Sequence, residues 1–287
     1  MEENKNLTTS QTFNLAVKNH QENKTDIAQD LYNQVLKIDP NHSQALNNLA
    51  VIFTNSKEYQ KAKKCYEKAI EIDPNYADAH NNLGIIFKEL REIEKAKNCF
   101  KKAIEINPTY LEAHNNLGAI FVELKDYQKA KDCYEKVIKI NPTYLDAHNN
   151  LGVIFNNLKK YQKAKDCFEK AIEINPNYAD PHNNLGIIYK ELRQNQKAKD
   201  CFEKAIKINP NYAPAYNSLG VLFESIREIK KASDCYKKAL EIDSLNKEYM
   251  TAYGNILLFL NDKFNGYEYI KKGQGVIKFT PLYSRII

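Results

Sequence analysis

Cysteine and histidine are the residue types in this sequence that most directly suggest chemistry, because both bind metals and both can act in catalysis. All six cysteines recur at intervals of 34 residues, at Cys65, Cys99, Cys133, Cys167, Cys201 and Cys235. Four histidines keep the same interval, at His80, His114, His148 and His182. One of each per interval, in identical surroundings and without a Cys-x-x-Cys, favours packing over a metal site, a disulfide or a catalytic pair. We therefore expect no catalytic residue, no metal and no cofactor.

Pairs of asparagines recur at this interval too. The pairs are Asn81-Asn82, Asn115-Asn116, Asn149-Asn150 and Asn183-Asn184, preceded by Asn47-Asn48. Asparagine is a mediocre helix former, so two in every interval require a reason. Its amide donates and accepts hydrogen bonds, as a peptide group does. The pattern favours a ladder of amides that binds an extended peptide through its backbone. The alternative is that the amides bond to neighbouring helices or to water.

Acidic residues lie on the same helical stripe as the asparagines. Three residues before a pair stand Asp78, Glu112, Asp146 and Asp180, and Glu89, Glu123 and Glu191 follow the pairs. Residues spaced at i, i+4, i+7 and i+11 share one face of a helix. An acidic face of this kind predicts a partner segment that carries Lys or Arg.

The elements that position these residues follow from the repeat. The segment 74–84 recurs at a spacing of 34, and six of the nine glycines and six of the nine prolines fall into columns. Helical spacing of apolar residues predicts a first helix over 77–90 and a second that ends before Pro108, because the residue before proline disfavours the α conformation. Equivalent positions in stacked helix pairs lie about one helix diameter apart, ~10 Å, too far for a disulfide or a shared metal.

This pattern resembles the tetratricopeptide repeat, whose signature is Leu-Gly-x-x-aromatic, then Ala-x-x-x-aromatic, then Pro, within 34 residues. The match is strong over 43–243 and looser over 9–246, with His in four units where an aromatic residue is usual. The resemblance implies an all-α fold, an α-α superhelix (a right-handed solenoid) of about seven to eight helix pairs. In that family the first helices line a concave groove, so the resemblance places the asparagine stripe on the ligand face.

The domain boundaries that we predict follow the units. They are a flexible N-terminus over 1–8, a degenerate unit over 9–42, six regular units over 43–246, a degenerate unit or capping helix over 247–273, and a tail over 274–287. Residues 256–260 are apolar on every side. The tail, with its Phe279, Leu282 and Tyr283, is one candidate to cover them, and a partner or a second copy of the chain is the other.

The Asn-Asn-Leu-Gly units look especially like the repeats before the catalytic region of O-GlcNAc transferases and Spindly-type protein O-fucosyltransferases. In those repeats the sixth-position asparagines, counted with Ala77 as position one, grip the substrate backbone. This role maps onto Asn48, Asn82, Asn116, Asn150 and Asn184. A transferase domain needs hundreds of residues, and about fifteen follow Gly273, so we expect recognition without sugar transfer. A co-chaperone carboxylate clamp is not matched, since the fifth position is Asn rather than Lys.

Charge and hydropathy set further limits. The net charge is +6, but the Lys columns of the second helices alternate with acids, as where Asp132 precedes Lys136 by four residues. This self-compensated face argues against nucleic acid. No apolar run approaches the roughly 18–20 residues of a membrane helix, and residues 1–10 are polar. We therefore expect a cytoplasmic or nuclear scaffold whose partner is a protein or an extended basic peptide, with no membrane partner and with self-association through the C-terminal apolar segment left open.

Overall fold

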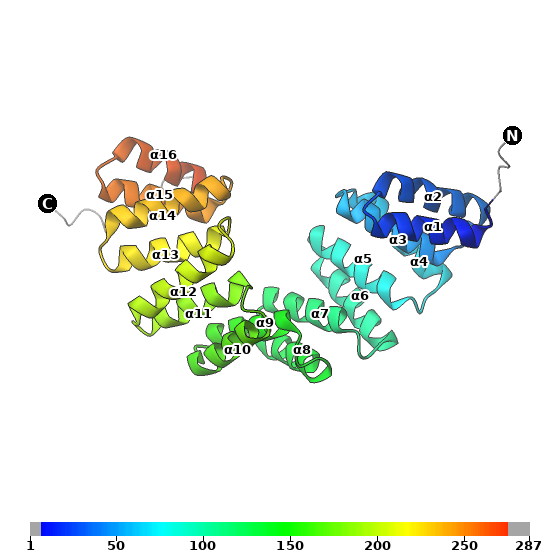
Figure 1. The fold of residues 1–287 in the computed structure, drawn as a ribbon, viewed down its shortest axis with the longest axis horizontal. Coiled ribbons are helices and arrows are strands. Elements are labelled where there is room, and N and C mark those ends of the chain that lie inside the picture. Colours follow the sequence, from blue (N-terminus) through cyan, green and yellow to red (C-terminus); the bar gives the residue numbers. More distant parts are fainter. Residues whose placement is uncertain (1–6, 275–287) are drawn as a thin grey trace. The chain divides into compact units, whose positions relative to one another are not determined.

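The structure is a computed structural model, which describes residues 7–274 (Figure 1). The described residues form sixteen α-helices and no strand. The chain divides into two compact units, 1–144 and 145–287. Within both units, each odd-numbered helix packs against the even-numbered helix that follows it. The prediction of an all-α fold built from about seven to eight helix pairs is confirmed, with eight pairs in the described residues.

The helices of the first unit are α1 (Thr9–Gln21), α2 (Thr25–Ile38), α3 (Ser43–Asn55), α4 (Tyr59–Ile72), α5 (Ala77–Glu89), α6 (Ile93–Ile106), α7 (Leu111–Glu123) and α8 (Tyr127–Ile140). Those of the second unit are α9 (Leu145–Asn157), α10 (Tyr161–Ile174), α11 (Ala179–Glu191), α12 (Asn195–Ile208), α13 (Ala213–Ser225), α14 (Ile229–Ile242), α15 (Lys247–Phe259) and α16 (Lys263–Gln274). None of these helices combines the length and the apolar character that crossing a bilayer requires.

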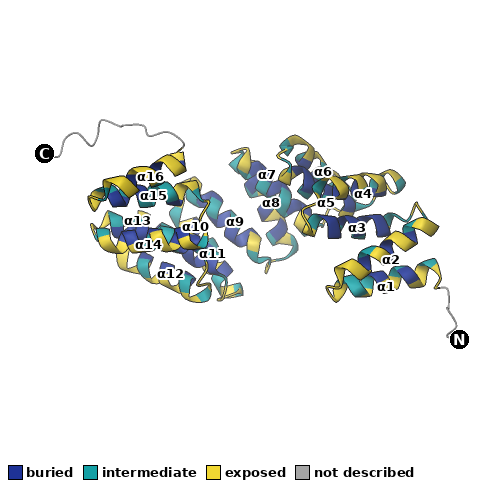
Figure 2. Ribbon diagram, turned by 90° about the horizontal axis from the view of Figure 1, so that it is seen from above, coloured by how far each residue is buried: buried dark blue, intermediate teal, exposed yellow. Residues whose placement is uncertain are grey.

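A glycine and an aromatic ring hold the two helices together in five of the six regular pairs, from α5 and α6 to α13 and α14. In the pair α9 and α10, a Cβ atom added to Gly152 would lie 2.5 Å from Cε1 of Phe168, whose side chain is fully buried. The same contact joins Gly84 to Phe100 and Gly186 to Phe202. Only glycine leaves room for the ring at this distance, which explains the glycine column. Figure 2 shows how buried and exposed residues alternate along the helices.

The turn between the two helices of a pair contains a residue in the left-handed conformation. Lys125, which follows α7, has a φ of 59°. Its N–H donates to the carbonyl of Val122 (2.9 Å), and the N–H of Asp126 donates to the carbonyl of Phe121 (2.8 Å). This is a Schellman cap, in which the last carbonyls of α7 find donors. Lysine occupies a conformation that favours glycine, so the cap is formed at the expense of backbone strain.

Replacing Lys125 by Gly is expected to raise the free energy of unfolding by about 0.5–1 kcal/mol, because the strain of a Cβ atom at positive φ is removed. The measurement is a guanidinium unfolding curve of the whole chain. Lys125→Ala is the matched control, since alanine removes the charge but keeps the Cβ atom. Equal stabilisation by Ala and by Gly would assign the effect to the charge and contradict the backbone explanation.

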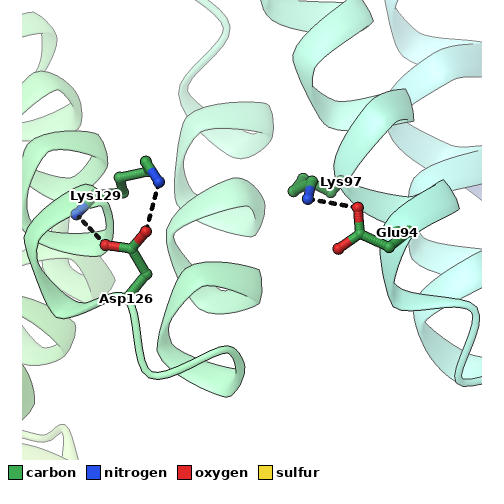
Figure 3. Close-up of polar contacts among 4 residues, drawn as sticks. All are labelled: Glu94, Lys97, Asp126 and Lys129. Carbon is green, nitrogen blue, oxygen red and sulfur yellow. Dashed lines mark hydrogen bonds and ion pairs between the residues drawn. The ribbon is translucent and has the colours of Figure 1, made fainter.

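The second helices carry many ion pairs on their exposed faces. Lys129 donates through its Nζ to Asp126 Oδ2 (2.6 Å) and through its backbone N–H to Asp126 Oδ1 (3.3 Å), and Lys97 pairs with Glu94 (2.5 Å; Figure 3). Such exposed pairs each contribute little to stability. They nonetheless compensate the Lys columns, as the sequence indicates.

The partners on this face differ from those expected. Asp132 accepts a hydrogen bond from Nε2 of Gln128 (2.8 Å), four residues before it, instead of pairing with Lys136. Lys131 pairs with Glu135 (3.2 Å). The expectation of Asp-to-Lys pairs was wrong because Gln128, one turn earlier, offers an amide donor to the same carboxylate.

Candidate functional site

The first helices of neighbouring pairs contact one another. In the first unit α3 contacts α5 and α5 contacts α7, and in the second unit α9 contacts α11 and α11 contacts α13. Each unit therefore presents its fifth- and sixth-position residues as a row that runs across consecutive first helices. We call this row, together with the acidic residues at position two, the first-helix surface of that unit.

The two asparagines of a pair occupy different environments. The fifth-position residues Asn81 and Asn183 are each 4% exposed, and Asn47 and Asn149 are buried as well. The sixth-position residue of every pair is half-buried. The sequence pattern treats the two positions alike, whereas the structure buries four fifth-position asparagines and leaves the sixth position, together with Asn115, half-buried.

In the first unit the amides form one hydrogen-bonded chain. Asn116 Nδ2 donates to Asn81 Oδ1 (3.0 Å), and Asn81 Nδ2 donates to Asn82 Oδ1 (3.3 Å). Asn82 Nδ2 in turn donates to Asn47 Oδ1 (3.4 Å), and Asn47 Nδ2 donates to Asn48 Oδ1 (3.3 Å). The two donations between helices, from Asn116 to Asn81 and from Asn82 to Asn47, both run from one first helix to the preceding one. The hydrogen bonds of such a chain strengthen one another.

The chain ends on a tyrosine. Asn48 Nδ2 donates to the hydroxyl of Tyr32 (3.3 Å), which lies 3.5 Å from Nδ1 of His20. In the preceding helix pair, α1 and α2, the fifth position is Phe13, which has no side-chain amide. The buried Tyr32 hydroxyl takes over as the acceptor at this end.

In the second unit the same contact is present once and then interrupted. Asn184 Nδ2 donates to Asn149 Oδ1 (2.9 Å). The next fifth-position residue, Asn183, has a buried Oδ1 atom without a hydrogen-bond partner. The residue 35 positions further on, which elsewhere donates to it, is Ser218. A serine side chain is shorter than that of asparagine, so the ladder stops there.

The sixth-position amide of Asn82 keeps part of its hydrogen-bonding capacity. An amide has two N–H donors and two acceptor lone pairs. Asn82 uses one donor toward Asn47 and one lone pair toward Asn81, both directed into the helix contact. One donor and one lone pair remain at the half-buried face, which is the complement that a peptide group requires.

Tyrosines reach the acidic residues of the stripe, a contact that our sequence interpretation missed. The Tyr178 hydroxyl donates to Asp146 Oδ1 (3.2 Å), and the Tyr212 hydroxyl donates to Asp180 Oδ1. Burial, followed by hydrogen bonding to Asp78, raises the pKa of Tyr110. These tyrosines stay protonated and fix the carboxylates in place. The sequence does contain a pattern that could have predicted these contacts, because tyrosine recurs at the last position of the 34-residue repeats.

The acidic residues themselves lie at the surface. Asp78, Glu112 and Asp146 are exposed, and Asp180 is half-buried beside Tyr212. Glu123, at the end of α7, forms an ion pair with Arg91, in the turn between α5 and α6 (3.6 Å). The position-two carboxylates accordingly give the first-helix surface of each unit a negative edge.

The histidines and cysteines pack as expected. Nε2 of His114 lies 3.0 Å from the carbonyl oxygen of Pro108, and Nε2 of His182 lies 3.1 Å from that of Pro176, so each ring ties a first helix to the turn before it. Burial raises the pKa of Cys133 to about 12 and that of Cys99 to about 11, which keeps these thiols protonated. In the described residues no three His, Cys, Asp or Glu side chains gather around a point that could hold a metal ion.

Helix pairs of constant length with one repeated Gly–aromatic contact define a helical repeat protein. The Tetratricopeptide repeat model matches residues 43–76, 77–110, 111–144, 145–178 and 179–212, and a second Tetratricopeptide repeat model matches 201–232. These matches cover more than half of the chain, so the protein belongs to the tetratricopeptide repeat family.

Solved structures share the fold. A tetratricopeptide repeat protein from Parabacteroides merdae is 18% identical, with 93% of this chain and 98% of that chain covered and a TM-score of 0.70. YrrB, described as a TPR protein with an unusual peptide-binding site, is 23% identical, with 64% and 95% covered and a TM-score of 0.52. MamA is 27% identical, with 56% and 94% covered and a TM-score of 0.52. Comparison with curated proteins gave no match.

Proposed function

We propose that this chain is a protein-interaction scaffold whose first-helix surfaces each hold an extended peptide segment of a partner. The contacting amides in this proposal are the sixth-position residues Asn48, Asn82, Asn116, Asn150 and Asn184. The observation that carries it is the half-buried amide of Asn82, which retains a donor and an acceptor after satisfying its neighbours. Because five consecutive repeats carry the same amide, the surface suits a repeating peptide backbone more than a particular side chain.

The fifth-position asparagines have a supporting role in this proposal. Asn81, Asn115, Asn149 and Asn183 belong to this set. Asn81 is buried, and its amide holds both Asn82 and Asn116 in position. A fixed amide loses little conformational freedom when a ligand binds, which favours affinity. In this proposal Asn81 and Asn149, which accept from Asn116 and Asn184, position the contacting amides and do not touch the ligand.

The acidic edge selects the partner. Asp78, Glu112, Asp146 and Asp180 stand beside the amides, and a segment with Lys or Arg complements them. YrrB, which has the same fold, has a peptide-binding site, which is consistent with this use of the surface. The likeness to the recognition repeats of O-linked glycosyltransferases concerns the same amides and stays a prediction about ancestry.

The proposal is tested with arrays of extended twelve-residue peptides that are basic, neutral or acidic. Asp78→Asn combined with Glu112→Gln is expected to weaken binding of the basic peptides about fivefold and to leave the neutral peptides unchanged, because two exposed charge pairs are lost. The measurement is the Kd of each peptide at two salt concentrations. A preference of the unmodified chain for acidic peptides would end the charge argument.

Asn82→Ala combined with Asn116→Ala is expected to weaken every class of peptide about tenfold, since backbone hydrogen bonds do not depend on sequence. Asn98→Ala, on the exposed face of α6, is the matched control and should bind as the unmodified chain does. Circular dichroism checks that helicity is retained. Unchanged affinity of the double variant would remove the amides from the recognition surface.

A further inference from the structure

Two neighbouring cavities lie at the C-terminal end of the second unit. The first, of about 430 Å³, is lined by Glu224, Lys247, Glu248, Thr251, Asn255 and Gly273. The second, of about 500 Å³, is lined by Val221, Glu224, Ser225, Arg227, Ile229 and Phe259. Glu224 belongs to both, so the cavities adjoin. Phe259 is 51% exposed at the rim of the second.

The chemistry of the two cavities calls for a ligand with both charge and apolar surface. In the first cavity two carboxylates, Glu224 and Glu248, outnumber the ammonium of Lys247. In the second, Val221, Ile229 and Phe259 form apolar walls, while Arg227 balances Glu224. A suitable segment has a basic residue close to apolar ones.

The sequence after Gln274 has this composition. Residues 275–287 read Gly-Val-Ile-Lys-Phe-Thr-Pro-Leu-Tyr-Ser-Arg-Ile-Ile, with seven large apolar residues, two basic residues and no acidic residue. They lie outside the described residues. Pro281 and the β-branched residues disfavour a helix, and an extended segment is what a first-helix surface accommodates.

The end of the described chain brings this segment to the first cavity. Gly273 lines that cavity and packs so closely on α15 that an added Cβ atom would lie 2.4 Å from Oγ1 of Thr251 and 2.6 Å from the carbonyl oxygen of Lys247. Thirteen extended residues span up to roughly 45 Å, more than twice the length of a helix of thirteen residues, about 20 Å. The segment can therefore cross both cavities from its point of attachment.

We propose that residues 275–287 bind across these two cavities of the second unit in the same chain, with Lys278 or Arg285 at Glu224 and Glu248 and with apolar residues against Phe259. This inference rests on the proposed function, because it assigns an internal ligand to part of a peptide-binding surface. The tether gives the segment a high effective concentration, on the order of millimolar. A partner segment of similar chemistry competes with it for the surface.

The chain contains no tryptophan, so Phe279→Trp places a single fluorescent reporter in the segment. Its emission is expected to be blue-shifted and protected from quencher relative to a free peptide of residues 275–287 with the same substitution. Glu248→Lys should restore free-peptide emission, whereas Glu203→Lys, an exposed acid of α12, should not. Circular dichroism confirms that both variants keep their helices.

Two results would overturn the inference. One is emission of the reporter equal to that of the free peptide. The other is a buried reporter that ignores Glu248→Lys, which would place the segment elsewhere. A blue shift that appears only as the protein concentration rises, together with dimer formation, would assign the occupant to a second copy and also overturn binding within one chain.

A second arm separates this inference from the proposed function. Lys278→Glu combined with Arg285→Glu is expected to release the segment and to tighten binding of an added basic extended peptide about tenfold. If the reporter is buried but no added peptide binds to either chain, the proposed function fails and the internal contact stands. If the reporter is exposed and added peptides bind equally to both chains, the internal contact fails and the proposed function stands.

Discussion

Replacing Gly152 by Ala is expected to lower the free energy of unfolding by about 2 kcal/mol. The new Cβ atom would lie 2.5–2.9 Å from three atoms of the Phe168 ring, and the ring is fully buried and cannot move aside. Overpacking of this kind costs about 3 kcal/mol, and the better helix propensity of alanine offsets about 1 kcal/mol. The midpoint of guanidinium unfolding, monitored by circular dichroism, measures the loss.

The sign of this effect should depend on the ring. In a Phe168→Leu background the planar ring is gone, so Gly152→Ala should be neutral or stabilise the chain by up to about 1 kcal/mol. The double-mutant cycle therefore yields a large coupling between the two positions. An equal loss in both backgrounds would mean that the glycine column does not exist to admit the aromatic ring.

Exchanging asparagine and serine at the sixth position is expected to shift stability in opposite directions in neighbouring pairs. Asn184→Ser should cost about 2 kcal/mol, because Asn149 Oδ1, which accepts from Asn184 at 2.9 Å, would be left buried without a donor. A buried acceptor that loses its partner is bonded neither to protein nor to water. The loss of stability is therefore larger than for an exposed hydrogen bond, whose acceptor can bond to water.

Ser218→Asn makes the reverse change and should raise the free energy of unfolding by about 1 kcal/mol, since its amide would supply the donor that Asn183 Oδ1 lacks. Thermal unfolding of the two single variants and of their combination measures both effects. Asn217→Ser, in which the neighbouring half-buried fifth-position residue loses its amide, is the control for composition. Stabilisation by Asn184→Ser, or loss of stability in Ser218→Asn, would refute a structural ladder.

Most of the fold could be read from the sequence because its rare residue types occur in columns. Gly84 and Phe100 appear at corresponding places in unit after unit, and such periodicity is preserved only where one local geometry is repeated. The helix limits were within one or two residues, as for α5, which ends at Glu89. The left-handed conformation of the turn residue Arg91, with a φ of 62°, was not predicted, because nothing in the chemistry of arginine marks it.

The candidate site was only half readable. The asparagine pairs stood out through their composition, but adjacent residues on a helix point about 100° apart, and this difference decides which one is buried. Asn81 turns toward the neighbouring first helix and Asn82 toward the surface. The tyrosine contacts to Asp146 and Asp180 join residues 32 positions apart, so they depend on how the two ends of a unit meet.

By itself, the sequence predicted an all-α array of about seven to eight helix pairs, the columns that pack between them and the stripe on which amides and carboxylates lie. These follow from local periodicity, since each unit repeats one set of contacts. The tertiary structure decided which amide is buried in hydrogen bonds to its neighbours and which lies at the surface. It also decided that the ladder ends at Tyr32 and at Ser218. Hydrogen-bond partners in neighbouring helix pairs are set by the offset between adjacent first helices. No spacing of residues within a single helix encodes that offset.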